Sequence, residues 1–228
     1  MNVAIIPARG GSKRIPRKNI KMFCGRSIIV YSIQAALESE LFDEVMVSTD
    51  DEEIASVARQ HGASVPFMRS AETSGDYATT ADVLLEVLGA YSKFGKTFDY
   101  VCCIYPTAPF VDADKLGRAM EMLLASDADS LVPIVAFSYP PLRGLTVNNG
   151  KLVMKWPEYS NMRSQDIQQL YHDSGQFYII RTAALISEET LFAKNTVPLI
   201  LSELEVQDID SEADWKLAEM KYRLMQGG

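Results

Sequence analysis

The chain has 228 residues, which is long enough for one α/β domain with a small appendage, and its content of 47% hydrophobic and 23% charged residues is typical of a soluble globular protein. Its net charge of −8 argues against binding to nucleic acid or to an anionic membrane surface. No apolar run reaches about 18 residues, and the amino terminus, MNVAIIPARGG, lacks the charged and long apolar regions of a signal peptide. The three cysteines have no metal-ligand spacing, which fits a reducing compartment. We therefore expect a cytoplasmic protein that neither spans nor binds a membrane.

Short apolar runs alternate with amphipathic stretches over residues 1–136. The apolar runs predict strands at Val3–Pro7, Glu44–Thr49, Ser64–Met68, Tyr100–Tyr105 and Ser130–Ala136. The amphipathic stretches predict helices at Ser27–Leu37, Asp51–Gln60, Ala81–Ser92 and Asp114–Ala125. Strands that alternate with helices of about 10 to 15 residues form right-handed βαβ units. The sequence therefore predicts an α/β fold with an open, mostly parallel sheet flanked by helices.

Residues 137–172 interrupt this alternation. The Asn-Asn-Gly sequence at 148–150 lies between two short β-like pieces and predicts a hairpin. The stretch is too small to bury a core, so we interpret it as a β-rich insert that packs on the main domain or on a second subunit. Core character returns with a strand at Gln176–Arg181 and a last helix at about Glu212–Met225. We thus divide the chain into an α/β domain, residues 1–136 and 173–228, and an insert, residues 137–172.

A cationic loop follows the first predicted strand. Residues 9–21 hold six cations and no acid, although the whole chain is acidic: Arg9, Lys13, Arg14, Arg17, Lys18 and Lys21. Gly10 and Gly11 let backbone N–H groups turn towards an anion, while Arg9 and Lys13 supply charge. The loop matches neither the Walker A nor the dinucleotide glycine pattern. It predicts a diphosphate or triphosphate site, with a solvated charged loop as the alternative.

Asp208 and Asp210 precede the last predicted helix. Carboxylates two residues apart in an extended segment point to one side, which suits Mg²⁺ together with phosphate oxygens and water. The alternative is helix capping by Asp210 or Ser211, with Asp214 completing a capping box, but capping does not explain Asp208. Beside a phosphate loop we favour the metal.

Other polar segments also follow predicted strands, where ligands collect in open α/β sheets. The acids of Ser48–Glu53 are explained by helix capping and the helix dipole, so we assign them no catalytic role. Tyr105–Phe110 lies where a substrate wall is expected. His172, beside Asp173, Ser174 and Gln176, is either a ligand contact or a structural histidine.

Five segments together resemble the CMP-acylneuraminate synthetase family of cytidylyltransferases. They occur in the family's order and span almost the whole chain: IIPARGGSKRIPRKNI (5–20), VSTDDEEIA (47–55), CIYPTAPF (103–110), HDSGQFY (172–178) and QDIDSEADW (207–215). The first segment is specific to the family, and the others are weaker individually. The resemblance implies a Rossmann-like nucleotidyltransferase fold and the Mg²⁺-dependent transfer of CMP from CTP to the anomeric hydroxyl of an acidic nonulosonic sugar.

The resemblance also implies a role for individual residues and a homodimer with an exchanged insert. The nucleotide site would contain Ala8, Arg9, Gly10, Ser12, Lys13, Lys18 and Asn19 at the phosphates and Arg69, Ala78 and Thr80 around the cytidine. The sugar site would contain Tyr105, Arg143 from the partner subunit's insert, Arg163, His172, Ser174, Gln176 and Tyr178. The catalytic residues would be Arg9, Lys13, Lys18 and Asp210, and the metal ligands Asp208 and Asp210. A metal-bound hydroxide, Asp210 and His172 are the candidate general bases, and none of them is assigned.

Three departures from the sialic acid enzymes bear on the sugar. This chain has Tyr105 where they have Gln, His172 near the place of an Arg, and Arg14 where they usually have Gly. Replacing an amide and a guanidinium with Tyr and His favours a less hydroxylated sugar. The direction fits pseudaminic acid, a 9-deoxy diacetamido sugar, and the sequence resembles family members that serve bacterial flagellin glycosylation.

Several alternatives remain open from the sequence. The sugar could be sialic, legionaminic or 3-deoxy-octulosonic acid, or the enzyme could be an NDP-hexose pyrophosphorylase. From another class, the chain could be a regulatory module that binds CTP without turnover.

Overall fold

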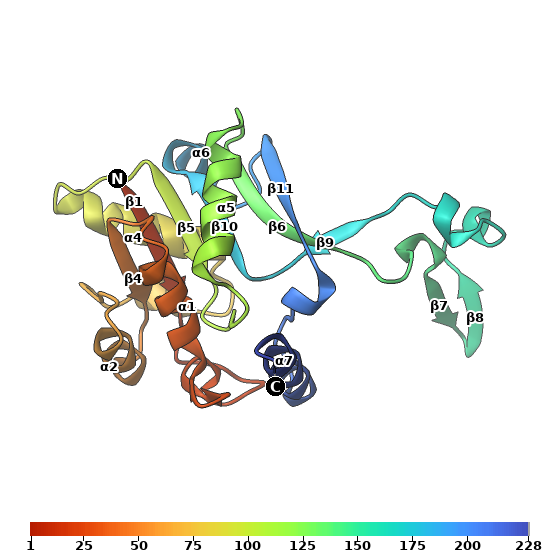
Figure 1. Cartoon of the computed structure of the whole chain (residues 1–228), viewed down its shortest axis with the longest axis horizontal. Helices are drawn as coiled ribbons and strands as arrows, with labels where there is room; N and C mark the ends of the chain where they lie inside the picture. Colours follow the sequence, from red (N-terminus) through yellow and green to blue (C-terminus); the bar gives the residue numbers. More distant parts are fainter. Residues whose placement is uncertain (228) are drawn as a thin grey trace.

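A computed structural model describes residues 1–227 and has one open sheet at its centre (Figure 1). Within this described part, seven strands form the main sheet, with the order β11-β6-β10-β5-β1-β4 and β9 paired to β6. Their bounds are β1 Asn2–Pro7, β4 Glu44–Ser48, β5 Tyr100–Ile104, β6 Ser130–Ala136, β9 Tyr171–Asp173, β10 Phe177–Arg181 and β11 Thr196–Leu201. β9 and β10 run antiparallel to the others. The predicted open, mostly parallel α/β sheet is therefore confirmed.

Helices cover both faces of this sheet (Figure 1). Side chains of α1, α2 and α5 join one buried apolar cluster with the sheet, and those of α4 and α6 join another on the opposite face. The α-helices are α1 Ile28–Glu38, α2 Glu52–Gln60, α3 Ala71–Ser74, α4 Thr80–Lys93, α5 Ala113–Leu124, α6 Thr182–Glu188 and α7 Glu212–Met225. Short 3₁₀ turns are η1 Lys18–Ile20, η2 Pro141–Arg143, η3 Pro157–Tyr159, η4 Ser164–Asp166 and η5 Glu203–Glu205. None of the helices in the described chain is long and apolar enough to cross a membrane.

A third apolar cluster ties the cationic loop to the carboxyl-terminal helix. Phe23 lies in a small hairpin formed by β2, Met22–Phe23, and β3, Arg26–Ser27. Its ring packs edge-on against Tyr31 of α1 and against Trp215 and Tyr222 of α7. The chain segment after the loop is therefore held by aromatic packing between its first and last α-helices.

One predicted strand is wrong. Ser64–Met68 forms only a single bridge, between Ser64 and Met46, because Pro66 has no N–H to continue a ladder. We also did not predict β9, β11, α6, the β2–β3 hairpin or the short α3. β11 contains Pro198, which is tolerated because β11 lies at the edge of the sheet.

Pro133 interrupts the inner side of β6. Before Pro133, β6 pairs with β10, and after Pro133 it pairs with β9. The chain between β9 and β10 therefore leaves the ladder. The Pro133 carbonyl still accepts a hydrogen bond from the Ser174 amide at 3.0 Å. Gly175 then adopts a φ of +64°, and a Cβ there would lie 3.9 Å from Asp208 Cγ. The excursion thus brings the Ser174–Gln176 segment beside Asp208.

The segment between β6 and β9 extends away from the domain as an arm (Figure 1). The hairpin predicted from Asn-Asn-Gly forms there, with β7 at Leu145–Asn148 and β8 at Lys151–Met154. Asn149 and Gly150 have φ values of 51° and 73°, which suit the tight turn of a two-residue hairpin. Apolar side chains of the arm are exposed, among them Tyr139 at 83%, Val147 at 71% and Leu152 at 67%.

Candidate active site

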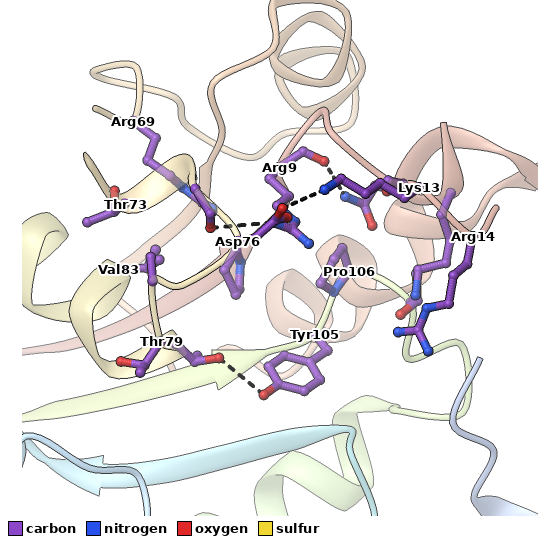
Figure 2. Close-up of a pocket in the computed structure, with 18 of the residues that line it drawn as sticks. Arg9, Lys13, Arg14, Arg69, Thr73, Asp76, Thr79, Val83, Tyr105 and Pro106 are labelled. Carbon is purple, nitrogen blue, oxygen red and sulfur yellow. Dashed lines mark hydrogen bonds and ion pairs between the residues drawn. The ribbon is translucent and has the colours of Figure 1, made fainter. Parts of the chain in front are cut away.

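A cavity of about 480 Å³ opens where β1 and β5 end (Figure 2). Eight of the residues predicted for the nucleotide line it: Arg9, Ser12, Lys13, Lys18, Asn19, Arg69, Ala78 and Thr80. Ala8 and Gly10 belong to the same loop but do not line the cavity, and Tyr105, directly after β5, lines it as well. The structure therefore brings the cationic loop, the segment before α4 and the end of β5 to one place.

Close backbone packing fixes the start of the cationic loop. The Gly10 amide donates a hydrogen bond of 2.8 Å to Asp50 Oδ1, and a Cβ on Gly10 would lie 2.8 Å from Asp51 Oδ2. No side chain fits there, so this position requires glycine. Asn19 donates from Nδ2 to the Arg9 carbonyl at 2.9 Å and closes the loop from its other end.

The acidic residues after β4 anchor this loop. Arg17 makes a two-pronged contact with Asp51, at 2.5 and 2.9 Å, and a further ion pair with Glu53. Asp51 also accepts hydrogen bonds from the amides of Glu53 and Ile54, so it caps α2 as predicted. The hydrogen bond from Arg17, together with the amide hydrogen bonds, lowers the pKa of Asp51 to about 2. From the sequence we assigned these acids only the capping role. Pairing the cationic residues 9–21 with the acidic residues 50–53 would have predicted this contact.

Arg9 and Lys13 converge on Asp76, which we did not predict (Figure 2). Their nitrogens lie 2.9 and 2.5 Å from its carboxylate oxygens. The hydrogen bonds from Lys13 and Arg9 hold the pKa of Asp76 below its usual value. The two cations are therefore already arranged to bind one anion.

The segment before α4 and the end of β5 form a further part of the cavity wall. Arg69 is buried and donates to Ser48 Oγ at 3.0 Å and to the Ser48 carbonyl at 2.5 Å. The Thr80 hydroxyl lies 3.2 Å from the Tyr105 hydroxyl. Tyr105 in turn packs edge-on against Tyr178, whose hydroxyl donates to Asp173. Polar groups of this wall are thus fixed by one another.

Lys18 links the cavity to the two aspartates predicted for the metal. Its Nζ donates to the Ile209 carbonyl at 2.7 Å and lies 3.7 Å from Asp210 Oδ1, and Arg14 also pairs with Asp210, at 2.7 Å. Burial, and then the nearby Asp210, raise the pKa of Asp208.

Capping of α7 is carried out by Ser211 with Asp214, which leaves the carboxylates of Asp208 and Asp210 outside the cap. No group of three or more His, Cys, Asp or Glu side chains placed for a metal occurs in the described residues. A cation here would need oxygens from phosphate or water as well. Two close carboxylates fit Mg²⁺ on those terms.

Tyr105 lines the cavity, whereas the other residues predicted for the sugar do not line it and fall into three groups. Ser174, Gln176 and Tyr178 are almost fully buried, and Ser174 Oγ and Gln176 Oε1 have no hydrogen-bond partner in the described structure. His172 is exposed and packs against Phe137. Arg143 and Arg163 lie in the arm and do not line the cavity, and Arg143 donates to Ser164 while Arg163 pairs with Asp166.

An open α/β sheet with a cationic loop over a nucleotide-sized cavity defines a nucleotidyltransferase-type fold. The chain belongs to the cytidylyltransferase family of enzymes, because the family model described as Cytidylyltransferase matches residues 3–220. It is 40% identical over 224 residues, 98% of this chain and 97% of the relative, to the pseudaminic acid cytidylyltransferase of Campylobacter jejuni. It is 31% identical over 226 residues, 98% of this chain and 97% of the relative, to the CMP-N,N'-diacetyllegionaminic acid synthase of Legionella pneumophila.

A solved structure supports the fold. The structure of CMP:2-keto-3-deoxy-manno-octonic acid synthetase complexed with CTP aligns with a TM-score of 0.71 and 18% sequence identity. The alignment covers 100% of this chain and 99% of that one. The predicted family and fold class are both confirmed.

The Arg17–Asp51 pair predicts how the loop's anchor depends on pH. Because the pKa of Asp51 falls from 3.8 to about 2 on folding, its stabilising effect is complete above about pH 4 and disappears as the pH falls towards 2. We expect Asp51→Asn, which can still cap α2, to lower the free energy of unfolding by about 1–2 kcal/mol at pH 7. Urea unfolding between pH 7 and pH 2.5 measures this difference. A difference that grows as the pH falls would contradict the assignment.

Proposed function

We propose that this protein transfers CMP from CTP to the anomeric hydroxyl of an acidic nonulosonic sugar and releases pyrophosphate, with pseudaminic acid as the sugar. The observation that carries the proposal is the convergence of Arg9 and Lys13 on one carboxylate inside the cavity, with Lys18 extending towards two further aspartates. The similarity to the pseudaminic acid and legionaminic acid enzymes supports the same chemistry.

The triphosphate would take the place of the Asp76 carboxylate. Phosphates carry more negative charge than one carboxylate, and an arginine can bind two phosphate oxygens at once. Attack on the α-phosphorus needs in-line positioning and charge neutralisation more than covalent help. In this arrangement Arg9, Lys13 and Lys18 stabilise charge on the phosphates, and backbone amides near Gly10 and Ser12 add hydrogen bonds. Asn19 keeps the loop closed, while Arg69, Ala78 and Thr80 surround the cytidine.

Asp208 and Asp210 would hold Mg²⁺. Bound by these two carboxylates, Mg²⁺ would supply positive charge to the reacting phosphate and would make the attacking hydroxyl more acidic. Arg14 and Lys18 contact Asp210 from the loop side, so this chain's own cations keep its carboxylate turned towards the phosphate-binding loop. Asp210 would thereby also serve catalysis, because it would keep Lys18 of the loop close to the metal site.

The sugar would lie beyond Tyr105, next to the aspartates. Burial raises the pKa of Tyr105, so its hydroxyl stays protonated and can donate a hydrogen bond to the sugar. Gln176, Ser174 and Tyr178 would support this wall from beneath, and His172 would contact the sugar from β9. One ring and one hydroxyl suit the 9-deoxy pseudaminic acid better than a sugar with a longer polyhydroxyl tail, and the product would serve flagellin glycosylation.

The arm would complete the site of a second subunit. Arg143 and Arg163 lie on the arm, away from their own cavity, while exposed apolar side chains such as Val147 and Leu152 have no core of their own. A homodimer would cover these side chains and bring a guanidinium to the sugar carboxylate of the partner.

The direct test of the proposed function is a substrate screen. We expect pyrophosphate release with CTP, Mg²⁺ and pseudaminic acid, and slower release with legionaminic, sialic or 3-deoxy-octulosonic acid. UTP, GTP and ATP should give little turnover in place of CTP. Binding of CTP with no pyrophosphate release from any acidic sugar would instead indicate a regulatory module.

The metal assignment predicts a loss of activity without a loss of fold. Asp208→Ala should remove Mg²⁺-dependent pyrophosphate release, because one of the two carboxylates for the ion is gone. The melting temperature should stay within about 4 °C, since Asp208 makes no ion pair in the described structure. Arg9→Ala, which leaves the aspartates intact, should lower the rate by roughly 10² to 10³. Retained activity in Asp208→Ala would show that the metal lies elsewhere.

The dimer proposal predicts an effect confined to the arm. Light scattering at micromolar concentration should give the mass of two chains, and Leu152→Lys should shift it towards one chain. Ile186→Lys is the matched control, because Ile186 is 58% exposed on α6 of the main domain and should not affect assembly. A wild-type monomer, or equal effects of both variants, would contradict the proposal.

A further inference from the structure

The segment that carries Asp208 and Asp210 has no strand or α-helix of its own. It connects the end of β11, Leu201, to the start of α7, Glu212, and only the turn η5 is regular. Its carbonyls accept hydrogen bonds from side chains: Gln176 donates to Glu205, Lys221 to Glu203 and Val206, and Lys18 to Ile209. A segment without a backbone ladder is therefore held by donors from several elements.

Lys115 is the most buried of the charged groups around this segment. Its side chain is 2% exposed, and its Nζ donates to the Phe110 carbonyl at 2.7 Å. The same Nζ lies 3.2 Å from Glu205 Oε1 and 3.7 Å from Asp112 Oδ2. The Phe110 carbonyl accepts a hydrogen bond, and the two carboxylates lie within ion-pair distance of the ammonium. The buried charge is thus fully compensated.

Glu205, the last residue of η5, forms the ion pair with Lys115. One carboxylate oxygen contacts Lys115, while the other accepts a hydrogen bond from the Ser202 amide at 3.1 Å. Its carbonyl is bound by Gln176 at 2.6 Å. Side chain and backbone of one residue are therefore both fixed, and Asp208 follows only three residues later, within about 10 Å along even an extended chain.

A structural role alone does not account for an ion at this position. A buried ion pair contributes little stability compared with apolar side chains of the same size, because both charges lose their hydration. A methionine would fill the space of Lys115. Unlike a methionine, the ammonium group contacts oxygens on two separate segments, the loop after β5 and η5. It therefore holds these two segments at fixed distances from each other.

We propose that Lys115 is a positioning residue that fixes the Asp208–Asp210 segment against the phosphate-binding loop by holding Glu205. This inference rests on the proposed function, in which the two aspartates bind Mg²⁺. Lys115 does not line the cavity, and its effect on the reaction passes through Glu205.

The test compares Lys115→Met, Glu205→Gln and the double variant in the full-length protein. Lys96→Met is the matched control, because Lys96 forms a partly buried ion pair with Glu44 on another part of the sheet. Hydrogen exchange followed by mass spectrometry reports the amides of residues 203–210 without any ligand. Pyrophosphate release at varied MgCl₂ reports the Mg²⁺ concentration for half-maximal rate, and CTP binding without Mg²⁺ reports the phosphate loop.

We expect faster exchange of residues 203–210 in Lys115→Met and a Mg²⁺ requirement raised roughly 10-fold to 100-fold. CTP binding without Mg²⁺ should stay at the wild-type value. The double variant should be no worse than Lys115→Met, because both changes remove one contact. Lys96→Met should alter neither quantity.

An unchanged exchange rate or an unchanged Mg²⁺ requirement in folded Lys115→Met would overturn the proposal, as would additive effects in the double variant. If Lys115→Met does not fold, Glu205→Gln removes the same ion pair from its more exposed side and decides by the same two measurements. If wild-type protein shows no transfer to any sugar, the proposed function fails, and hydrogen exchange alone then supports or overturns the role of Lys115.

Discussion

The arrangement of the site depends on ion pairs between the cationic loop and the protein's own acids. All six cations between residues 9 and 21 lie within 4 Å of a carboxylate of the described chain. The pairs are Arg9 and Lys13 with Asp76, Arg14 and Lys18 with Asp210, Arg17 with Asp51 and Glu53, and Lys21 with Glu212. These acids lie after β4, before α4, and just before or at the first residue of α7. One loop therefore sets the position of three segments that are far apart in the sequence.

Two backbone constraints make this arrangement specific. Gly10 lets the loop approach Asp51 more closely than any side chain would allow. Pro133 interrupts the ladder on the side of β6 that faces β10 and β9, so that Gly175 leaves the sheet and lies beside Asp208. The first constraint brings the loop to the acids after β4, and the second brings the chain after β9 to the aspartates before α7. Both constraints come from a group that the residue lacks: glycine has no Cβ, and proline has no backbone N–H.

The sequence predicted those features that depend on local patterns. Apolar runs predicted β1, β4, β5 and β6, and the Asn-Asn-Gly sequence predicted the hairpin of the arm. β10 was predicted as a strand but not as an antiparallel one, because direction depends on which strands flank it. Asp76 and Lys115 were not predicted, since an isolated acid or lysine has no pattern until the fold shows which oppositely charged groups surround it. The residues assigned by resemblance to the nucleotide were placed around one cavity, whereas Arg143 and Arg163 were placed on an arm that leaves it.

The ion pairs of the loop differ in a way that suits a site which must bind and release an anion. The Arg17–Asp51 pair is two-pronged and partly buried, and Asp51 also caps a helix, so breaking it would disturb α2 as well as the loop. The pairs of Arg9 and Lys13 with Asp76 are exposed to water, where an ion pair contributes little to stability. In the proposed function, a phosphate would therefore replace Asp76 at low cost while Arg17 keeps the conformation of the loop. Asp76 neutralises the two cations proposed to bind phosphate, so ligand binding would exchange one anion for another and would not have to bring the cations together.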